Sequence, residues 1–502
     1  MKPLTLFQGC GVSALILFRL YGSSIAYPSD LRMHTPVPLT NVALSIIVNL
    51  IIAGVVLAFV GQWIGNTPRL NWLRFLLPGA LLALLVKVVG INLGARIHPS
   101  VLIAVCLGIT LVVLVLRQKV RRGAQVASSL TGAVLLGMGI FSCFAVAQLA
   151  HIALWKPVPN FVDNLAAANS VASDRPRVVW ILFDELSYQQ TFGDRYANLR
   201  LPNFDQLRQS STLFTDVQPV ANYTELAIPS ILLNSSVVRT KYTFNNRLLV
   251  IQAGEHSFRP FDAMKTPFAM ARKAGLTTAA IGWYNPYCGM LAPYLNLCYW
   301  TNEEEIPLIF GIRDGFWKDL GAPWAHYAED AFAPAGRKRL AARRVDTYKD
   351  LLRHSDDALE RQNLDLIFLH LPLPHPPGFY NRNSQQFDLS GNRSYVDNLA
   401  LADKTLGEWM AILQRSPRWK NTDVIICGDH SWRPWFWSST AMWTTEDQMA
   451  SHGGRYDARP VLMVHGAGQI APATVTAPYS LLQVHGILDS FIGRTNPDIA
   501  SQ

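Results

Sequence analysis

The chain has 502 residues, of which 50% are hydrophobic and 16% are charged. This composition is too apolar for an ordinary soluble enzyme, and the length suffices for two or three domains, so we expect a membrane part beside a folded one. Lysine and arginine exceed aspartate and glutamate, giving a formal charge of +9. Several basic residues flank apolar runs, which indicates membrane orientation, so no nucleic-acid partner is predicted.

Five apolar stretches in the first third of the chain have the length of membrane helices, which is ~20 residues. They cover residues 6–26, 41–64, 70–92, 100–117 and 129–154. Arg19 interrupts the first stretch and Lys87 the third, and long basic side chains of this kind can reach the headgroup level. The first stretch also resembles a signal peptide, but no clear cleavage site follows it, so we expect an uncleaved helix.

The loop between the fourth and fifth stretches carries a basic cluster, formed by Arg117, Lys119, Arg121 and Arg122. The positive-inside rule places this loop in the cytoplasm. With five spans, everything after the last helix is then extracytoplasmic. We therefore predict a transmembrane domain over 1–156 in the inner (cytoplasmic) membrane, multi-pass, with the remaining chain on the periplasmic side.

Residues 176–502 are predicted to form an α/β domain, joined to the spans by a linker over 157–175. Apolar runs of strand length alternate with helical patterns, which predicts a mostly parallel sheet covered on both faces. The predicted strands are 177–183, 277–281, 364–369, 423–427 and 460–464, and the predicted helices between them include 202–209, 268–274 and 396–413. The region 285–345 shows no clear strand and is expected to be a surface insertion.

The six cysteines show no paired spacing such as C-x-x-C, which argues against a zinc finger or a redox motif. Cys288 and Cys298 lie close together in the part expected outside the cytoplasm. A disulfide between them and two free thiols both remain open at this point.

Residues with metal-ligand chemistry fall at the ends of these predicted strands. Asp184 and Glu185 follow the first strand, and Asp429 and His430 follow the fourth. Carboxylates and imidazoles are ligands that zinc and manganese prefer, and strand carboxyl ends meet at one edge of a parallel sheet. Other candidates at or after strand ends, or before a helix, are Thr224, His370, His375 and His452. Each has an ordinary alternative, since an acid pair or a threonine can cap a helix and a strand-end histidine can be a core residue.

Taken in order, these segments resemble the motifs of the alkaline phosphatase/sulfatase superfamily. The matching stretches are Ile-Leu-Phe-Asp-Glu at 181–185, Thr224 with Ile228 and Pro229, Leu-Pro-His-Pro-Pro at 373–377, Tyr-Val-Asp-Asn at 395–398 with Asp403, Gly-Asp-His at 428–430 and Arg-Pro-Val-Leu at 459–462. With five preceding spans, the chain most resembles the membrane-anchored phosphoethanolamine and phosphoglycerol transferases, which include lipoteichoic acid synthase-like enzymes. The resemblance implies an alkaline phosphatase-like α/β/α sandwich. The C/S-x-P-x-R nucleophile motif of sulfatases is absent, which disfavours sulfate ester hydrolysis.

The resemblance also implies the roles of the site residues. Thr224 would be the nucleophile, and His375 and His452 would touch the substrate phosphate or a second metal. Of the two acids after the first strand, Asp184 ranks above Glu185 as the inner ligand, but both stay candidates. The implied metal ligands are Asp184, Glu185, Thr224, Asp429 and His430. The implied cofactor is a divalent metal, with zinc as the first choice and manganese or magnesium as alternatives.

A threonine hydroxyl needs such a metal, because zinc lowers the pKa of bound water from ~15.7 to ~7–9. We expect Thr224 to carry a phospho-alcohol group, of phosphoethanolamine or phosphoglycerol type, from a phospholipid donor to an envelope lipid or glycan acceptor. A membrane-anchored phosphodiesterase or phosphatase and a non-catalytic, lipid-binding regulator of envelope assembly remain alternatives. An aromatic group after His430 is either an interfacial or sugar-stacking rim or a buried cluster; it comprises Trp432, Trp435, Phe436, Trp437 and Trp443.

Overall fold

The computed structural model describes residues 3–22, 28–69, 79–80, 82–84, 86, 99–119, 123–165, 175–302, 315–332 and 336–494. The chain divides into two compact units. The first comprises Met1–Pro28, Pro38–Lys156 and Ile309–Ala328, and the second comprises Ser29–Val37, Pro157–Leu308 and Glu329–Gln502. Each unit therefore contains a segment that is remote in sequence from the rest of it.

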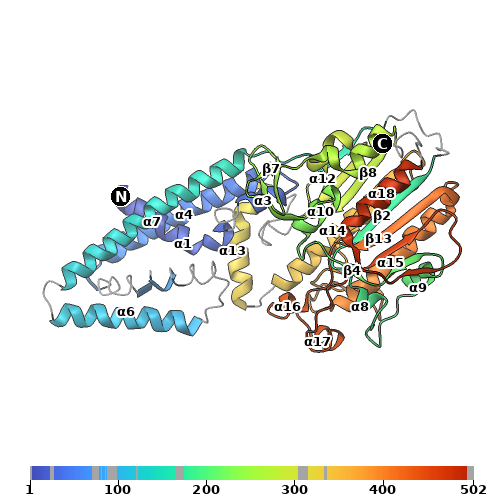
Figure 1. The fold of residues 1–502 in the computed structure, drawn as a ribbon. Helices are drawn as coiled ribbons and strands as arrows, with labels where there is room; N and C mark the ends of the chain where they lie inside the picture. Colours follow the sequence, from blue (N-terminus) through green and yellow to red (C-terminus); the bar gives the residue numbers. More distant parts are fainter. Residues whose placement is uncertain are drawn as a thin grey trace. The chain divides into compact units, whose positions relative to one another are not determined.

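The first unit is helical (Figure 1). Its main helices are α1 (Pro3–Ile16), α4 (Thr40–Asn66), α6 (Pro99–Lys119), α7 (Gly123–Leu154) and most of α13 (Phe316–Phe332). In the described part of the chain, two stretches are long and apolar enough to cross a membrane, Thr40–Asn66 and Gly132–Leu154. They match the second and fifth predicted spans. Shorter apolar helices, Thr5–Ile16 and Ser100–Val112, fall in the first and fourth. The third predicted span, with Lys87, lies largely outside the described residues, so five spans and their orientation stay predictions.

Small residues let the helices of the first unit approach closely. A Cβ atom on Gly9 would lie 2.2 Å from the Gly54 carbonyl oxygen, and one on Gly11 would lie 2.6 Å from the backbone of Met138. Close approach of this kind gives dispersion contacts between apolar helices. Asn49 of α4 joins α13 to the unit, because its Oδ1 accepts from Trp324 Nε1 at 2.7 Å and its Nδ2 donates to the Leu320 carbonyl at 3.0 Å.

A nine-stranded sheet forms the centre of the second unit. Its strands, in spatial order, are β1 (Phe161–Asp163), β9 (Leu297–Thr301), β8 (Thr278–Trp283), β10 (Leu366–Leu371), β2 (Arg177–Phe183), β13 (Thr422–Gly428), β14 (Leu462–His465), β3 (Thr212–Phe214) and β15 (Ala473–Val475). The five strands from β9 to β13 pair in parallel. The predicted α/β class with a mostly parallel sheet is thus confirmed.

All five predicted strands are present, but two predictions are corrected. The strand expected at 460–464 is β14, which runs antiparallel to β13. The region 285–345 is not free of strands, because it contains β9, which pairs in parallel with β8. That region also contributes α13 and the first part of α14 (Gly336–Glu360).

Helices cover both faces of the sheet (Figure 1). Successive side chains of a strand point to opposite faces, so the apolar run of β2 serves two cores. Val179, Ile181 and Phe183 pack with α14, with α9 (Pro202–Arg208) and with α15 (Tyr395–Arg415). Val178, Trp180 and Leu182 pack in the other core, with α10 (Thr224–Leu233), α11 (Pro267–Lys273) and α18 (Val484–Gly493).

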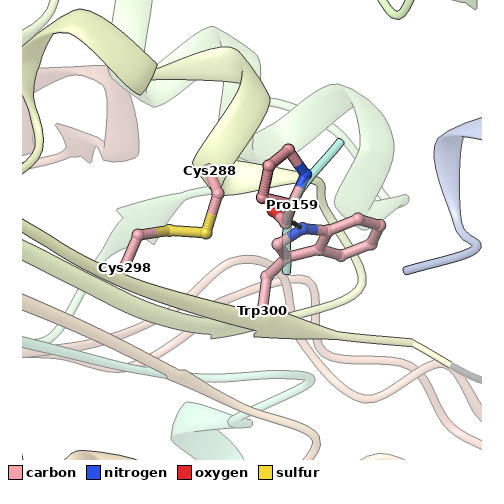
Figure 2. The surroundings of a disulfide bond; sticks show 4 residues. All are labelled: Pro159, Cys288, Cys298 and Trp300. Atoms are coloured by element: carbon pink, nitrogen blue, oxygen red, sulfur yellow. Dashed lines mark hydrogen bonds between the residues drawn. A yellow bond between two sulfur atoms is a disulfide. The ribbon is translucent and has the colours of Figure 1, made fainter. Parts of the chain in front are cut away.

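Cys288 and Cys298 form a disulfide, which ties α12 (Tyr287–Met290) to β9. Figure 2 shows the bond beside Trp300, whose Nε1 donates to the Pro159 carbonyl at 3.2 Å. Of the two alternatives for these cysteines, the structure therefore has the disulfide. Such bonds persist in oxidising compartments, which suits the extracytoplasmic placement predicted for this unit.

Candidate active site

Three neighbouring parallel strands bring the predicted residues to one edge of the sheet. Asp184 directly follows β2, Asp429 directly follows β13, and His370 is the penultimate residue of β10. Gly428 is paired with Phe183 and His370 with Leu182, so the three strands end at nearly the same level. The three side chains are fully buried.

Thr224 joins this group from the helix side. It is the first residue of α10, and its Oγ1 donates to Asp184 Oδ2 at 3.0 Å. The N-cap position of α10 is Tyr223, and no side chain caps this helix end. The ordinary alternative for Thr224, a helix cap, is therefore not what the structure has. The hydroxyl is instead directed at the acid that follows the central strand.

Asp429 and His430 bring two hydrogen-bond acceptor atoms, a carboxylate oxygen and a ring nitrogen, close together. Asp429 Oδ1 accepts from the Glu185 backbone N–H at 3.1 Å. His430 Nδ1 lies 3.1 Å from the Ser431 carbonyl, which places its proton there and leaves Nε2 as an acceptor. That Nε2 lies 3.2 Å from Asp429 Oδ2. Two acceptors at this distance need a cation or a proton between them.

The buried atoms around these side chains fit a divalent metal. Within the described residues, Asp184 Oδ1, Asp429 Oδ2, His370 Nε2 and His430 Nε2 have no hydrogen-bond partner, although buried polar atoms are normally paired. Burial, together with the charge of Asp429, raises the pKa of Asp184 well above its ordinary value. A cation would pair these atoms and offset the repulsion between the two carboxylates. Oxygen and imidazole donors suit zinc or manganese.

Glu185 has different side-chain partners from its neighbour Asp184. Its φ of 63° is in the left-handed region, which is uncommon for a residue other than glycine and marks strain at functional turns. Its carboxylate accepts from Arg433 Nε at 2.5 Å and from Trp437 Nε1 at 2.9 Å. By distance alone, Asp184, Glu185 and His430 can offer three ligand atoms within 4.8 Å of one another. Because the Glu185 oxygens are already paired, the geometry favours Asp184 as the metal ligand.

Arg433 is a site residue that the sequence analysis missed. Besides Glu185, its Nη1 donates to the Asn222 carbonyl at 2.8 Å, two residues before Thr224. Burial opposes its charge, but the neighbouring Glu185 raises the pKa of Arg433 above its ordinary value. The guanidinium therefore ties the Thr224 loop to the strand end. Its position three residues after His430 is the sequence signal that could have found it.

His375 is buried beside the site, together with a second missed arginine. His375 Nδ1 lies 2.6 Å from the Pro376 carbonyl and 3.3 Å from Arg344 Nη2. Arg344, on α14, stacks over Trp283 at 4.6 Å. Burial lowers the pKa of Arg344 to about 10, against the opposing charges of Asp184 and Glu185, so it remains a cation at neutral pH. Burial, then the charge of Arg344, lowers the pKa of His375 well below its ordinary range.

The remaining two histidines differ in their surroundings. His370 is fully buried, with Nδ1 at 2.7 Å from the Tyr287 hydroxyl and Nε2 at 3.6 Å from Asp184 Oδ2. Burial lowers its pKa to about 4, so it is neutral. His452 is half exposed, and its Nε2 lies 3.1 Å from Asp194. No described contact joins His452 to the cluster, so its catalytic role stays a prediction.

The aromatic group after His430 is mixed. Trp432 and Trp437 are buried, and Trp437 bonds to Glu185, so the buried-cluster alternative holds for these two. Trp435 is 46% exposed. It alone of the three tryptophans just after His430 presents a large aromatic face to the surface.

A family model described as "Sulfatase" matches residues 176–485, which is more than half of the chain. No curated protein matches it. Among solved structures, this chain is similar to Ps i-CgsB in complex with a neocarrahexaose, at 13% identity and a TM-score of 0.40. The match covers 65% of this chain and 74% of that one. It is also similar to the phosphonate monoester hydrolase of Agrobacterium radiobacter, at 16% identity and a TM-score of 0.38, over 64% and 74%. A third likeness is a protein in the alkaline phosphatase superfamily from Vibrio parahaemolyticus, at 14% identity and a TM-score of 0.36, over 68% and 72%.

Proposed function

The chain belongs to the sulfatase family, within the alkaline phosphatase/sulfatase superfamily, and from this premise we propose that it is a metal-dependent phosphotransferase whose nucleophile is Thr224. The group transferred is a phospho-alcohol of phosphoethanolamine or phosphoglycerol type. The donor is a phospholipid and the acceptor an envelope lipid or glycan, with the catalytic unit held at the periplasmic face of the inner membrane.

The observation that carries this proposal is the bond from Thr224 Oγ1 to Asp184 Oδ2 at 3.0 Å. It aims a hydroxyl at a buried acid whose other oxygen, Oδ1, has no partner among the described residues. Burial raises the pKa of Asp184, so this carboxylate accepts a proton more readily than a surface one. A hydroxyl that only capped a helix would bond to the backbone of its own first turn.

A divalent cation held by Asp184, Asp429, His430 and Thr224 would supply a Lewis acid that lowers the pKa of the threonine hydroxyl and screens negative charge on the phosphate. Thr224 Oγ1, losing its proton toward Asp184, forms a bond to phosphorus while the bond from phosphorus to the departing alcohol breaks. The departing oxygen takes up the proton that Asp184 accepted from Thr224. Arg344 and Arg433 provide buried positive charge beside the phosphate oxygens. An acceptor hydroxyl then attacks the same phosphorus, and Thr224 regains its proton.

A hydrolase is the second candidate, because water as acceptor needs the same nucleophile and the same residues. Product analysis separates the two. Loss of a headgroup from phospholipid, with no modified lipid or glycan, would support the hydrolase. A non-catalytic regulator would not need a threonine, two acids and a histidine in bonding contact, and the intact cluster argues against that alternative.

The test is intact-protein mass spectrometry of the full chain, in detergent with zinc or manganese, after incubation with phospholipid. We expect an adduct on Thr224 whose mass identifies the transferred group. Thr224→Ala should show no adduct and should lose at least about a thousandfold in turnover, because the nucleophile is gone. Thr224→Ser, which keeps the hydroxyl, is the matched control and should retain both. Full turnover in Thr224→Ala would overturn the proposal.

A further inference from the structure

A cavity of about 430 Å³ lies in the second unit. Its walls come from three segments: Gln189 and Asp194 after β2, Asp216 and Gln218 around β4 (Val217–Gln218), and the stretch from Arg455 to Arg459 before β14. The volume is within the range of small-ligand sites. None of the candidate metal ligands lines it, so it is separate from the metal cluster.

Hydrogen bonds connect this cavity to Asn222, two residues before the nucleophile. Tyr456, which lines the cavity, donates from its hydroxyl to Asn222 Oδ1 at 2.9 Å. The Asn222 carbonyl accepts from Arg433, which also bonds to Glu185. On the other wall, Gln189 follows Asp184 by only five residues. A ligand in the cavity would therefore lie against the loop that carries Thr224.

The charged groups of the cavity are nearly balanced, which does not favour the anionic donor. Asp194, Asp216 and Asp457 outnumber Arg455 and Arg459. Arg459 is moreover already paired, with its Nε at 3.0 Å from Asp457 Oδ1 and its guanidinium 4.6 Å over the Tyr188 ring. The same pairing offsets the charge of Asp457, and Asp194 Oδ2 lies 3.1 Å from His452 Nε2. The cavity therefore has no excess positive charge that would attract an anionic phosphodiester. The acceptor, which is the second substrate of a transferase, can be neutral, and a neutral acceptor does not need a positively charged site.

The chemistry of the walls suits a sugar. Carboxylates, carboxamides and guanidinium groups form hydrogen bonds with neighbouring hydroxyls, as donors and acceptors in a fixed arrangement. An exposed aromatic face completes the set, because Trp435 is 46% exposed and its ring centroid lies 6.5 Å from that of Tyr456. Aromatic rings of this kind pack against the C–H faces of sugars while polar side chains bond to the hydroxyls.

We propose that this cavity binds the acceptor of the transfer reaction, and that the acceptor is a neutral, polyhydroxylated sugar. This inference rests on the proposed function, since it names the second substrate of the same site. The sugar hydroxyl that enters the Thr224 loop attacks phosphorus, the bond from phosphorus to Thr224 Oγ1 breaks, and the hydroxyl proton passes to that oxygen. The side chains that bind the sugar are Gln189 and Gln218 in the cavity wall and Trp435 beside Tyr456.

The experiment measures both halves of the reaction in the full chain, in detergent with zinc or manganese. The donor probe is bis-para-nitrophenyl phosphate, and the acceptor probes are glucose and maltose. Nitrophenol release reports cleavage of the donor, and mass spectrometry reports the ratio of sugar carrying a nitrophenyl phosphoryl group to nitrophenyl phosphate, the hydrolysis product. We expect Gln189→Ala, Gln218→Ala and Trp435→Ala each to lower that ratio roughly three- to tenfold, as for a lost hydrogen bond or packing contact. Nitrophenol release should stay unchanged.

Gln386→Ala is the matched control, because Gln386 is an exposed glutamine on β12 (Gln386–Phe387) that does not line the cavity. It should change neither readout. Unchanged ratios in Gln189→Ala, Gln218→Ala and Trp435→Ala would overturn the proposal. Nitrophenol release by the wild type with no transfer to either sugar would also overturn it. If the wild type released no nitrophenol, the proposed function itself would fail and the acceptor role would fall with it.

Discussion

Asp184 and Glu185 are adjacent in sequence but point to different partners. Asp184 accepts from Thr224, whereas Glu185, in a left-handed conformation, pairs with Arg433 and Trp437. The backbone turn at Glu185 thus separates a candidate metal ligand, Asp184, from a carboxylate that bonds to Arg433. The two acids should therefore respond differently to loss of their charge.

We predict that Asp184→Asn loses bound metal and activity, while Glu185→Gln retains metal but unfolds more easily. Gln at 185 would leave the Arg433 charge buried without its partner, which typically costs about 3–5 kcal/mol. Metal content by mass spectrometry and unfolding in urea measure the two effects. Equal metal loss in both variants would contradict the assignment of Asp184 as the ligand. Glu360→Gln, at an exposed acid at the end of α14, serves as the control.

The sequence predicted Asp184, Asp429 and His430 together because residues after parallel strands must meet at one sheet edge. Thr224, which begins α10, was predicted from the family resemblance. It left the choice between Asp184 and Glu185 open, since this depends on one φ angle that no residue pattern encodes. Arg344 could not be predicted. It is on a long, charged helix, and which of its many basic residues turns toward the sheet edge is decided by packing of the whole helix.

At the scale of elements, a short segment from between the first two predicted spans is part of the second unit. This segment, Ser29–Val37, contains most of α3 (Pro28–Met33). Met33 is buried in one of the two sheet cores. His34 Nδ1 lies 3.0 Å from the Tyr284 carbonyl, and Ser29 Oγ accepts from the Tyr242 N–H at 2.7 Å.

The contact at Tyr284 bears on the site. Tyr284 has a φ of 73°, a strained conformation that surrounding contacts must maintain. Its neighbour Trp283 is the ring on which Arg344 stacks. His34 packs its own ring against Tyr284, with centroids 4.0 Å apart. The segment therefore supports the backbone behind the arginine of the site.

We predict that His34 makes the second unit sensitive to acid. Burial lowers the pKa of His34 to about 4, against a smaller opposing effect of its bond to Tyr284. Between about pH 4 and the ordinary histidine pKa, the folded state then binds fewer protons than the unfolded state. The contribution of neutral His34 to the unfolding free energy is therefore complete above about pH 6.5. It is lost as the pH falls to about 4. Over that window the loss is about 3 kcal/mol.

The measurement is the urea midpoint of the wild type and of His34→Gln at several pH values from neutral to acid. Gln at 34 keeps a donor for the Tyr284 carbonyl but does not titrate. The wild type should lose more stability on acidification than His34→Gln does. Parallel curves for the two proteins would show that His34 does not contribute, whatever the metal ligands do in acid.

The disulfide between Cys288 and Cys298 is a second contact that stabilises this unit. It joins α12 to β9 next to Tyr287, whose hydroxyl bonds to His370. We predict that Cys288→Ser with Cys298→Ser lowers the unfolding free energy by about 2–4 kcal/mol, because the unfolded chain gains freedom. Thermal unfolding with and without reducing agent measures this. The double serine variant should no longer respond to the reductant, and a response there would implicate another cysteine.

At the scale of the whole molecule, the sequence predicted the α/β order because buried parallel strands read as continuous apolar runs, as at 177–183 and 423–427. It missed β9, a five-residue strand inside a region where polar and helical patterns dominate. Strands of three residues, such as β3 and β15, carry too little pattern to be found. The chain's division into units was also beyond sequence reasoning, because Ser29–Val37 and Ile309–Ala328 each belong with residues far away in the chain.

This division predicts how a soluble fragment behaves. A fragment over 157–502 contains the whole sheet but lacks Ser29–Val37, so the core position of Met33 and the Tyr284 carbonyl lose their partners. A synthetic peptide of residues 28–38 should bind the fragment and raise its melting temperature by about 2–4 °C at roughly tenfold excess over Kd. The same peptide with Met33→Asp is the control and should have no effect, because it would bury an unpaired charge. If the fragment alone melted at the temperature of the full chain, the segment would be dispensable to this unit.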